Sequence, residues 1–210
     1  MKLYNTVAKE ASAEQTIEKS RFITYVKPVS TKEEADAFIE QIKKKHRDAT
    51  HNVPAMVIGD KMQLQWASDD GEPQGTSGAP IVKMLTSAEI TNLVVVVTRY
   101  FGGIKLGTGG LARAYTSSAK LGLEAAGICS VESQLCLTAE IDYTYLAKIK
   151  SAEGQLFSIT DIRYAEKVEV DIACQPELRQ NTEAVLADKY FQVRKVLHFC
   201  FCGYSLSQEM

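Results

Sequence analysis

The chain has 210 residues, of which 45% are hydrophobic and 24% charged, and its formal net charge at pH 7 is −2. This length suits one large domain or two small ones, and a charge so near neutrality excludes a global attraction to nucleic acid, so any such contact must be a local patch. Residues 1–20 have no apolar core of a signal peptide, and no run approaches the about 20 apolar residues of a membrane span. With five cysteines and no CxxC pair, we expect a soluble, cytoplasmic protein.

The chain begins with a polar stretch, and the first clear strand is predicted over residues 19–26. A helix is expected next, because Thr31 and Glu34 have the spacing of a capping box. Four apolar residues then recur at i, i+3, i+4 and i+7, which is one face of a helix. These residues are Ala35, Phe38, Ile39 and Ile42.

A hairpin and a buried strand follow. Residues 51–58 and 62–66 are the predicted hairpin strands. A short helix is expected over residues 80–85. The continuous β-branched run 94–98 predicts a central strand, and a long helix rich in small residues is expected over about residues 109–126.

After Gly127 the rhythm of the sequence changes. The patterns predict strand, helix, a two-stranded hairpin, helix and strand, the last strand over residues 191–199. This order is the split-βαβ, or ferredoxin-like, plan. The sequence therefore predicts two α+β domains, the first over residues 1–131 and the second over residues 132–210.

Two glycine-rich loops bracket the predicted central strand, one over residues 68–80 and one over residues 99–110. Eight of the 13 glycines lie in this region. Glycine costs backbone entropy, so such a cluster indicates tight turns or a close approach of the backbone to a ligand. Both interpretations stay open at this point.

The second loop joins a strand to the start of a helix, and this arrangement can bind an anion through free amides and the helix dipole. We expect Thr108 to be the N-cap and Arg99 and Lys105 to supply positive charge. The loop is neither a P-loop nor a dinucleotide fingerprint, because the spacing differs. The expected anion or nucleic-acid contacts are Arg21, Arg99, Tyr100, Lys105, Gly107, Thr108, Gly109 and Gly110.

Aromatic residues lie near these positive charges. Tyr100 and Phe101 follow a strand end, where exposure is easy, and could stack bases beside Arg21. For Trp66 and Tyr115, a place in the core is the favoured interpretation.

The first loop carries Asp69, Asp70 and Glu72. At this spacing the three carboxylates could hold a magnesium ion, or they could cap turns and pair with arginine. The second interpretation is favoured, in which they order a loop that faces the anion site or engage a basic partner.

A nucleophile in the same loop, Thr76 or Ser77, would need a base from His46 or His51, and no GxSxG pattern is present. We therefore expect no catalytic residue, no metal ion and no cofactor. The predicted facing loop comprises Asp69, Asp70, Glu72, Thr76, Ser77 and His51.

Four stretches together carry a resemblance. Residues 68–73 read Ser-Asp-Asp-Gly-Glu-Pro, residues 75–80 Gly-Thr-Ser-Gly-Ala-Pro, residues 99–103 Arg-Tyr-Phe-Gly-Gly and residues 106–111 Leu-Gly-Thr-Gly-Gly-Leu. Together they resemble the motifs of the IMPACT/YigZ family. The resemblance implies a first domain like the second domain of ribosomal protein S-five and a second domain like the fifth domain of elongation factor G.

The resemblance also implies a role in translation, because eukaryotic relatives regulate translation through the activator of an amino-acid-starvation kinase. The resulting hypothesis is a non-enzymatic, translation-linked protein that binds RNA, the ribosome or a translation-associated protein. Two alternatives stay open: an enzyme acting on a small phosphorylated substrate, and a protein adaptor that uses the exposed face of the second sheet.

Overall fold

The structure is a computed structural model that describes residues 2–154, 156–186 and 192–203. It is an α+β protein with two sheets, and its contacts divide the chain into one unit containing residues 4–130 and another containing residues 131–201. Each unit has a hydrophobic core of its own. Within the described parts of the chain, no helix is long and apolar enough to cross a membrane.

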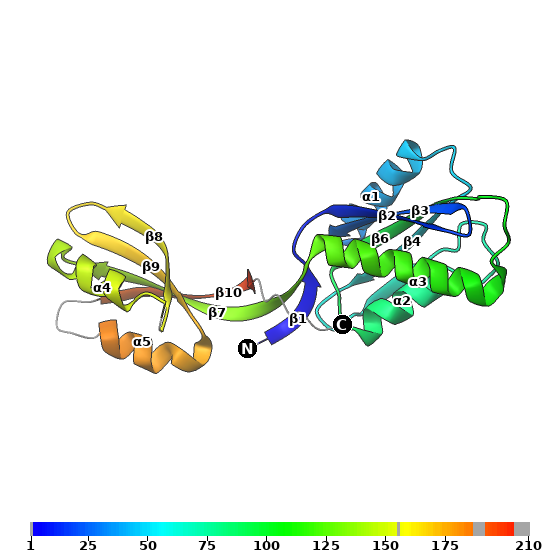
Figure 1. Cartoon of the computed structure of the whole chain (residues 1–210). Coiled ribbons are helices and arrows are strands. Elements are labelled where there is room, and N and C mark those ends of the chain that lie inside the picture. Colours follow the sequence, from blue (N-terminus) through cyan, green and yellow to red (C-terminus); the bar gives the residue numbers. More distant parts are fainter. Residues whose placement is uncertain (1, 155, 187–191, 204–210) are drawn as a thin grey trace. The chain divides into compact units, whose positions relative to one another are not determined.

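The first unit is built on an antiparallel sheet with the strand order β2-β3-β6-β4-β5. Helix α1 covers one face of this sheet, and helices α2 and α3 cover the other (Figure 1). The elements from the N-terminus to the end of α3 are β1 (Lys2–Val7), β2 (Ala11–Ile17), β3 (Ser20–Pro28), α1 (Lys32–Lys45), β4 (His51–Ile58), β5 (Leu64–Ala67), α2 (Gly78–Ser87), β6 (Leu93–Tyr100) and α3 (Gly107–Ala126).

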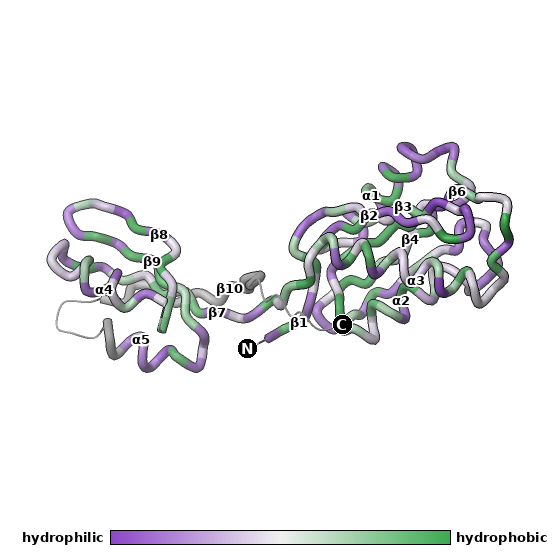
Figure 2. Tube along the Cα trace, in the orientation of Figure 1, coloured by the Kyte–Doolittle hydropathy of each residue, from purple (hydrophilic) through white to green (hydrophobic). Residues whose placement is uncertain are grey.

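Strand β6 lies in the middle of this sheet, as its sequence predicts. Val95 and Val97 pack into the core under α2 and α3, whereas Val94 and Val96 pack against α1. All four side chains are fully buried, and burying a valine stabilises the fold by about 1.5–3 kcal/mol. Figure 2 shows hydrophobic segments running through the strands and helices of this unit.

The first helix confirms its predicted cap. The side chain of Thr31 accepts a hydrogen bond from the amide of Glu34 at 3.3 Å, and the Glu34 carboxylate accepts one from the amide of Ser30 at 2.7 Å. The apolar face predicted for α1 is buried against the sheet. The predicted hairpin is also confirmed, because β4 pairs with β5 in antiparallel register.

Three features of this unit differ from the prediction. Strand β2 was not expected, and it pairs with β3 through a tight turn in which Glu18 and Lys19 have positive φ angles of 46° and 62°. Trp66 was expected in the core but is 43% exposed, because β5 is an edge strand. Cys129 is disulfide-bonded, which the cysteine spacing does not indicate.

The second unit has the predicted order of strands and helices. Its strands β7, β9 and β8 form consecutive antiparallel pairs, and β10 pairs with β7. Both expected helices begin with a short 3-10 turn. Residue 191, the expected start of the last strand, lies outside the described residues. The elements are β7 (Ile128–Ile141), η1 (Tyr143–Tyr145), α4 (Leu146–Ala152), β8 (Ser158–Tyr164), β9 (Val168–Cys174), η2 (Pro176–Leu178), α5 (Arg179–Leu186) and β10 (Gln192–Gly203).

One face of the second sheet is apolar and the other carries charge. Residues such as Leu137 and Val170 form the core, so the side chains that alternate with them lie on the opposite face. There Arg163 donates hydrogen bonds to three carboxylates at 2.6–3.2 Å. Its partners are Asp161, Glu169 and Asp171.

Candidate functional site

The two glycine-rich loops of the first unit meet at a pocket of about 420 Å³. We call it the glycine-loop pocket. Its walls come from the start of β4, the first loop, the end of β6, the second loop and the start of α3. The lining residues are Thr50, His51, Glu72, Pro73, Arg99, Phe101, Lys105, Leu106, Gly107, Thr108 and Leu111.

A buried carboxylate forms one side of this pocket. Oε1 of Glu72 accepts a hydrogen bond from Nη1 of Arg99 at 2.7 Å and another from the hydroxyl of Tyr115 at 2.7 Å. The Arg99 and Glu72 side chains are only 5% and 4% exposed. Burial and the hydrogen bond to Glu72 raise the pKa of Tyr115, so this hydroxyl stays protonated and acts as a donor.

Arg99 connects this carboxylate to the second loop. Its Nη2 donates to the Ser20 hydroxyl at 3.2 Å, and the same hydroxyl oxygen accepts from the Gly102 amide at 3.2 Å. The guanidinium contacts the rings of Phe22 and Phe101, with its carbon 5.5 and 5.3 Å from their centroids. Its Nε is buried and has no acceptor among the described residues. Arg99 therefore orders the pocket and keeps one unsatisfied donor.

His51 has one ring nitrogen fixed. Its Nδ1 lies 2.8 Å from the carbonyl oxygen of Asp70, and a carbonyl can only accept, so Nδ1 carries a proton. Its Nε2 lies 3.7 Å from Oε2 of Glu72. In the neutral ring Nε2 is free to accept a proton, and in the charged ring it pairs with Glu72. The pocket thus contains one group that can hold or move a proton at a defined atom.

Helix α3 begins at the pocket without a side-chain cap. The prediction that Thr108 is the N-cap is wrong: the helix starts at Gly107, its N-cap is Leu106, and Thr108 lies in the first turn. Leucine offers no polar atom to the first amides, which lack intrahelical acceptors. Gly107 has a φ of 70°, and a Cβ added there would meet open space, so backbone geometry, rather than a capping side chain, starts this helix. Lys105 lines the pocket beside it, with no ion pair to any described residue.

The three carboxylates of the first loop point to different partners. Asp69 accepts hydrogen bonds from the amides of Gly75, Ser77 and Gly78 and from the Ser77 hydroxyl at 2.6–3.1 Å, which fixes the start of α2. Burial alone would raise the pKa of Asp69, but these hydrogen bonds outweigh burial and lower it.

Asp70 and Thr76 also make contacts that hold the first loop in place. Asp70 accepts from the Asn52 amide at 2.6 Å and lies 3.1 Å from Nζ of Lys43, and the Thr76 hydroxyl donates to the Pro73 carbonyl at 2.6 Å. Because Asp69, Asp70 and Glu72 do not converge, their arrangement does not fit the magnesium alternative.

Two of the predicted anion contacts lie on the other face of the sheet. Arg21 and Tyr100 point to the face of the sheet covered by α1. Arg21 pairs with Glu14 at 2.7 Å on the surface. The Tyr100 hydroxyl lies 2.9 Å from Nδ1 of His46, whose Nε2 lies 2.7 Å from the Tyr25 hydroxyl. His46 is thus on the opposite face from the loop that carries Ser77, so it cannot act as the base that the nucleophile alternative needs.

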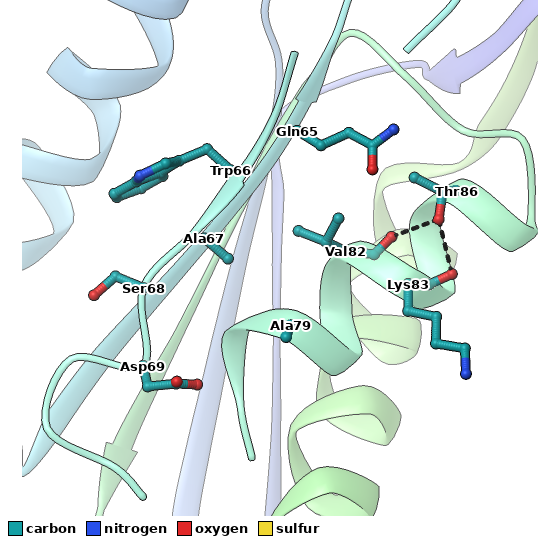
Figure 3. A pocket seen from close by; sticks show the side chains of 9 residues that line it. All are labelled: Gln65, Trp66, Ala67, Ser68, Asp69, Ala79, Val82, Lys83 and Thr86. Carbon is teal, nitrogen blue, oxygen red and sulfur yellow. Dashed lines mark hydrogen bonds between the residues drawn. The ribbon is translucent and has the colours of Figure 1, made fainter. Parts of the chain in front are cut away.

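A second pocket of about 520 Å³ lies between the edge strand β5 and helix α2 (Figure 3). Gln65 and Ala67 point toward α2, and the Trp66 ring lies on the other side of the strand. Two of its polar side chains are already engaged: Asp69 holds the start of α2, and Thr86 donates to two carbonyls of its own helix at 3.1 Å. The candidate site is the glycine-loop pocket, because residues of both glycine-rich loops line it.

The sequence did not indicate every residue of this site. For Tyr115 a place in the core was favoured over base stacking, and it is fully buried, but its hydroxyl also donates a hydrogen bond to Glu72. A polar atom at the end of an otherwise apolar helical stripe is the signal that could have revealed it. Phe101 is 45% exposed, as expected from its place after a strand end. The positions of Gly109 and Gly110 in the first turn of α3 agree with the geometry of an open helix start, although neither lines the glycine-loop pocket.

Comparison with known proteins places the whole site inside one type of domain. Residues 18–123 match the model of the Impact N-terminal domain. The chain is 46% identical over 170 residues to IMPACT family member YvyE of Bacillus subtilis, covering 80% of this chain and 78% of that protein. It is 38% identical over 144 residues to IMPACT family member YigZ of Escherichia coli, covering 67% and 70%. A crystal structure of a hypothetical protein is similar with a TM-score of 0.59 and 32% identity, covering 94% of this chain and 97% of that chain.

Proposed function

The chain belongs to the IMPACT family, and on that premise we propose that it is a translation-linked binding protein whose glycine-loop pocket takes a phosphate group of RNA. The proposal joins the role that the sequence motifs imply for the family to the chemistry of the pocket. It assigns no reaction and no cofactor to the protein.

The observation that carries this proposal is the uncapped start of α3 at the wall of the pocket. A helix N-terminus has an effective charge of about half a proton charge and free amides that point outward. Leu106 supplies no cap, and Lys105 stands beside the same opening. A phosphate oxygen is the type of acceptor that such a site favours.

The distribution of charge supports the first unit as the place of contact. The chain as a whole is slightly acidic, with a net charge of −2. The charged face of the second sheet gathers three carboxylates around Arg163, which disfavours an RNA phosphate there. Contact with RNA is therefore assigned to the local patch around Lys105 and the start of α3.

The test compares two lysines at different distances from the pocket. Lys105→Ala removes a lining residue, and Lys120→Ala removes an exposed lysine farther along α3. Binding of the full chain to a labelled single-stranded RNA is measured by fluorescence anisotropy over a series of salt concentrations. The expected result is weaker binding for Lys105→Ala only, with a salt slope shallower by about 0.7 to 1. Binding that does not respond to salt, or equal behaviour of the two variants, would contradict the proposal.

A second candidate function is supported by His51. Its fixed Nδ1 leaves Nε2 directed toward Glu72 in the pocket, which is a suitable position for a general base acting on a small phosphorylated substrate. A thermal-shift screen with nucleotides and magnesium discriminates the two, because a ligand that binds the native state raises its stability. A nucleotide shift followed by product formation that His51→Gln abolishes would favour the enzyme, and binding without turnover would favour the binding protein.

A further inference from the structure

We propose that the glycine-loop pocket binds one nucleotide through a terminal phosphomonoester, so that the protein recognises the phosphorylated end of a strand rather than its interior. This inference rests on the proposed function, since it names the part of the RNA that the pocket takes. A free mononucleotide carries the same chemistry, and the experiment below separates the two sources.

The first argument is the size of the pocket. A volume of about 420 Å³ falls in the range of sites that enclose one small ligand, about 300–1,000 Å³. Proteins that bind the interior of a single strand instead use a groove that spans about 4–16 nucleotides. A pocket of this size fits one nucleotide.

The second argument is the number of hydrogen-bond donors in the wall of the pocket. Lys105, Gly107 and Thr108 line the pocket, and the start of α3 has no side-chain cap, so the ammonium and the first amides of the helix are available as donors. The Arg99 side chain, 95% buried, also lines the pocket, and its Nε has no acceptor among the described residues. A phosphomonoester offers three terminal oxygens and a charge of about −1.5 to −2. An internal phosphodiester offers two such oxygens and one charge, so it leaves more of these donors unused.

The third argument is the apolar side of the pocket. Phe101 is 45% exposed and lines it together with Pro73, Leu106 and Leu111. The Arg99 guanidinium lies over the Phe101 ring, with its carbon 5.3 Å from the ring centroid. A nucleobase can stack on such a face regardless of its identity. Donors for an anion and an apolar face for a flat ring in one pocket match the two parts of a nucleotide.

The carboxylate in the pocket does not oppose this assignment. Oε1 of Glu72 is neutralised by Arg99 and also accepts from Tyr115. Its Oε2 faces Nε2 of His51 at 3.7 Å. The charge that an incoming phosphate meets is therefore set by Lys105 and the helix start.

The experiment uses the full chain and short single-stranded RNAs that are identical except at one end. One pair carries a 5′-phosphate or a 5′-hydroxyl and a label at the 3′ end, and a second pair carries a 3′-phosphate or a 3′-hydroxyl and a label at the 5′ end. We expect one phosphorylated end to bind at least about tenfold more tightly than its hydroxyl counterpart, because one hydrogen bond to a charged group is typically worth that factor. Equal binding within both pairs overturns the inference.

Unlabelled AMP and adenosine serve as competitors. AMP is expected to displace the phosphorylated strand and adenosine is not. AMP that competes as well as the strand identifies a free mononucleotide as the occupant, and AMP that competes more weakly identifies the strand end. Displacement by adenosine at the same concentration as AMP would show that the phosphate is not recognised, which overturns the inference.

Phe101→Ala tests the stacking face, and Trp66→Ala is its matched control, since Trp66 is a similarly exposed aromatic residue (43%) that lines the other pocket. We expect Phe101→Ala to weaken binding of the phosphorylated strand by at least about fivefold, Phe101→Tyr to restore it, and Trp66→Ala to leave it unchanged. Circular dichroism checks the fold of each variant. If Lys105→Ala weakens RNA binding but the end groups and Phe101 have no effect, the inference fails and the proposed function stands. If no RNA binds at all, the proposed function fails.

Discussion

The buried pair of Arg99 and Glu72 gives the sharpest prediction about stability. Glu72→Gln keeps the size of the side chain and one acceptor oxygen but removes the charge that compensates the guanidinium. Both side chains are at least 95% buried, so water cannot replace the lost partner. Removing one member of a buried ion pair destabilises a protein by about 3–5 kcal/mol. We expect the lower end, about 3 kcal/mol, because the amide oxygen still accepts hydrogen bonds from Arg99 and Tyr115.

Urea unfolding is a suitable assay, because Trp66 is the single tryptophan of the chain and lies in the same unit as the ion pair. Its fluorescence therefore reports the unfolding of this unit. With a urea dependence of about 1–3 kcal/mol per molar for a small domain, the midpoint should fall by about 1–3 M. The double variant Arg99→Met with Glu72→Gln should be less destabilised than the sum of the two single variants, because no charge is then left unpaired.

A second arginine–glutamate pair in the same unit provides the control. Arg21 and Glu14 are also 2.7 Å apart, but they lie on the surface, where such pairs contribute little. Glu14→Gln should leave the urea midpoint unchanged. A midpoint for Glu72→Gln that shifts no more than that of Glu14→Gln would refute the argument that burial, rather than distance, sets the strength of the Arg99 pair.

Three further predictions concern α3 and the first loop. Gly109→Ala should raise the stability of the fold by about 0.5 kcal/mol, because the added Cβ would meet only the end of a flexible arginine side chain. Gly122→Ala in the same helix should lower the stability by about 1–3 kcal/mol, because its Cβ would lie 2.5 Å from Thr24 Cγ2. Thermal unfolding measures both effects. Thr108→Asp should stabilise the start of α3 by about 0.3–1 kcal/mol. It should also weaken RNA binding, because the new carboxylate competes with phosphate for the anion site. Weaker RNA binding without any gain in stability would contradict this account. The pKa of Asp69 is lowered in the fold from its ordinary value of 3.8, so the protein should lose stability as the pH falls below 3.8 and through the folded pKa. In Asp69→Asn, the urea midpoint should depend less on pH in this acidic range.

Much of the fold could be predicted because it depends on local patterns. The valine run predicted a strand with two buried faces. The cap at Thr31 and the four apolar residues on one face of the following segment predicted the first helix. Strand β2 could not be predicted in this way, because its polar residues carry no strand signal. It forms because the turn at Glu18 and Lys19 brings it alongside β3.

The geometry of the pocket depends on long-range pairing, which a single sequence does not reveal. The sequence placed Arg99 and Tyr100 together as neighbours, but a strand turns them to opposite faces of the sheet. Glu72 meets Arg99 and Tyr115 from positions 27 and 43 residues away. The start of α3 was misplaced because Thr108 looks like a cap, whereas the backbone at Gly107 already begins the helix.

Strand register has a consequence for how this protein tolerates change. At the ends of β6, β4 and β3, the side chains of adjacent residues point to opposite faces of the sheet, as those of Arg99 and Tyr100 do. Inserting or deleting one amino acid within one of these strands would exchange the two sets of that strand; in β4 it would turn His51 away from the loops and place Asn52 there instead. Length variation among homologues should therefore be confined to the connections between strands, and an indel inside a strand would mark a protein in which the pocket no longer exists.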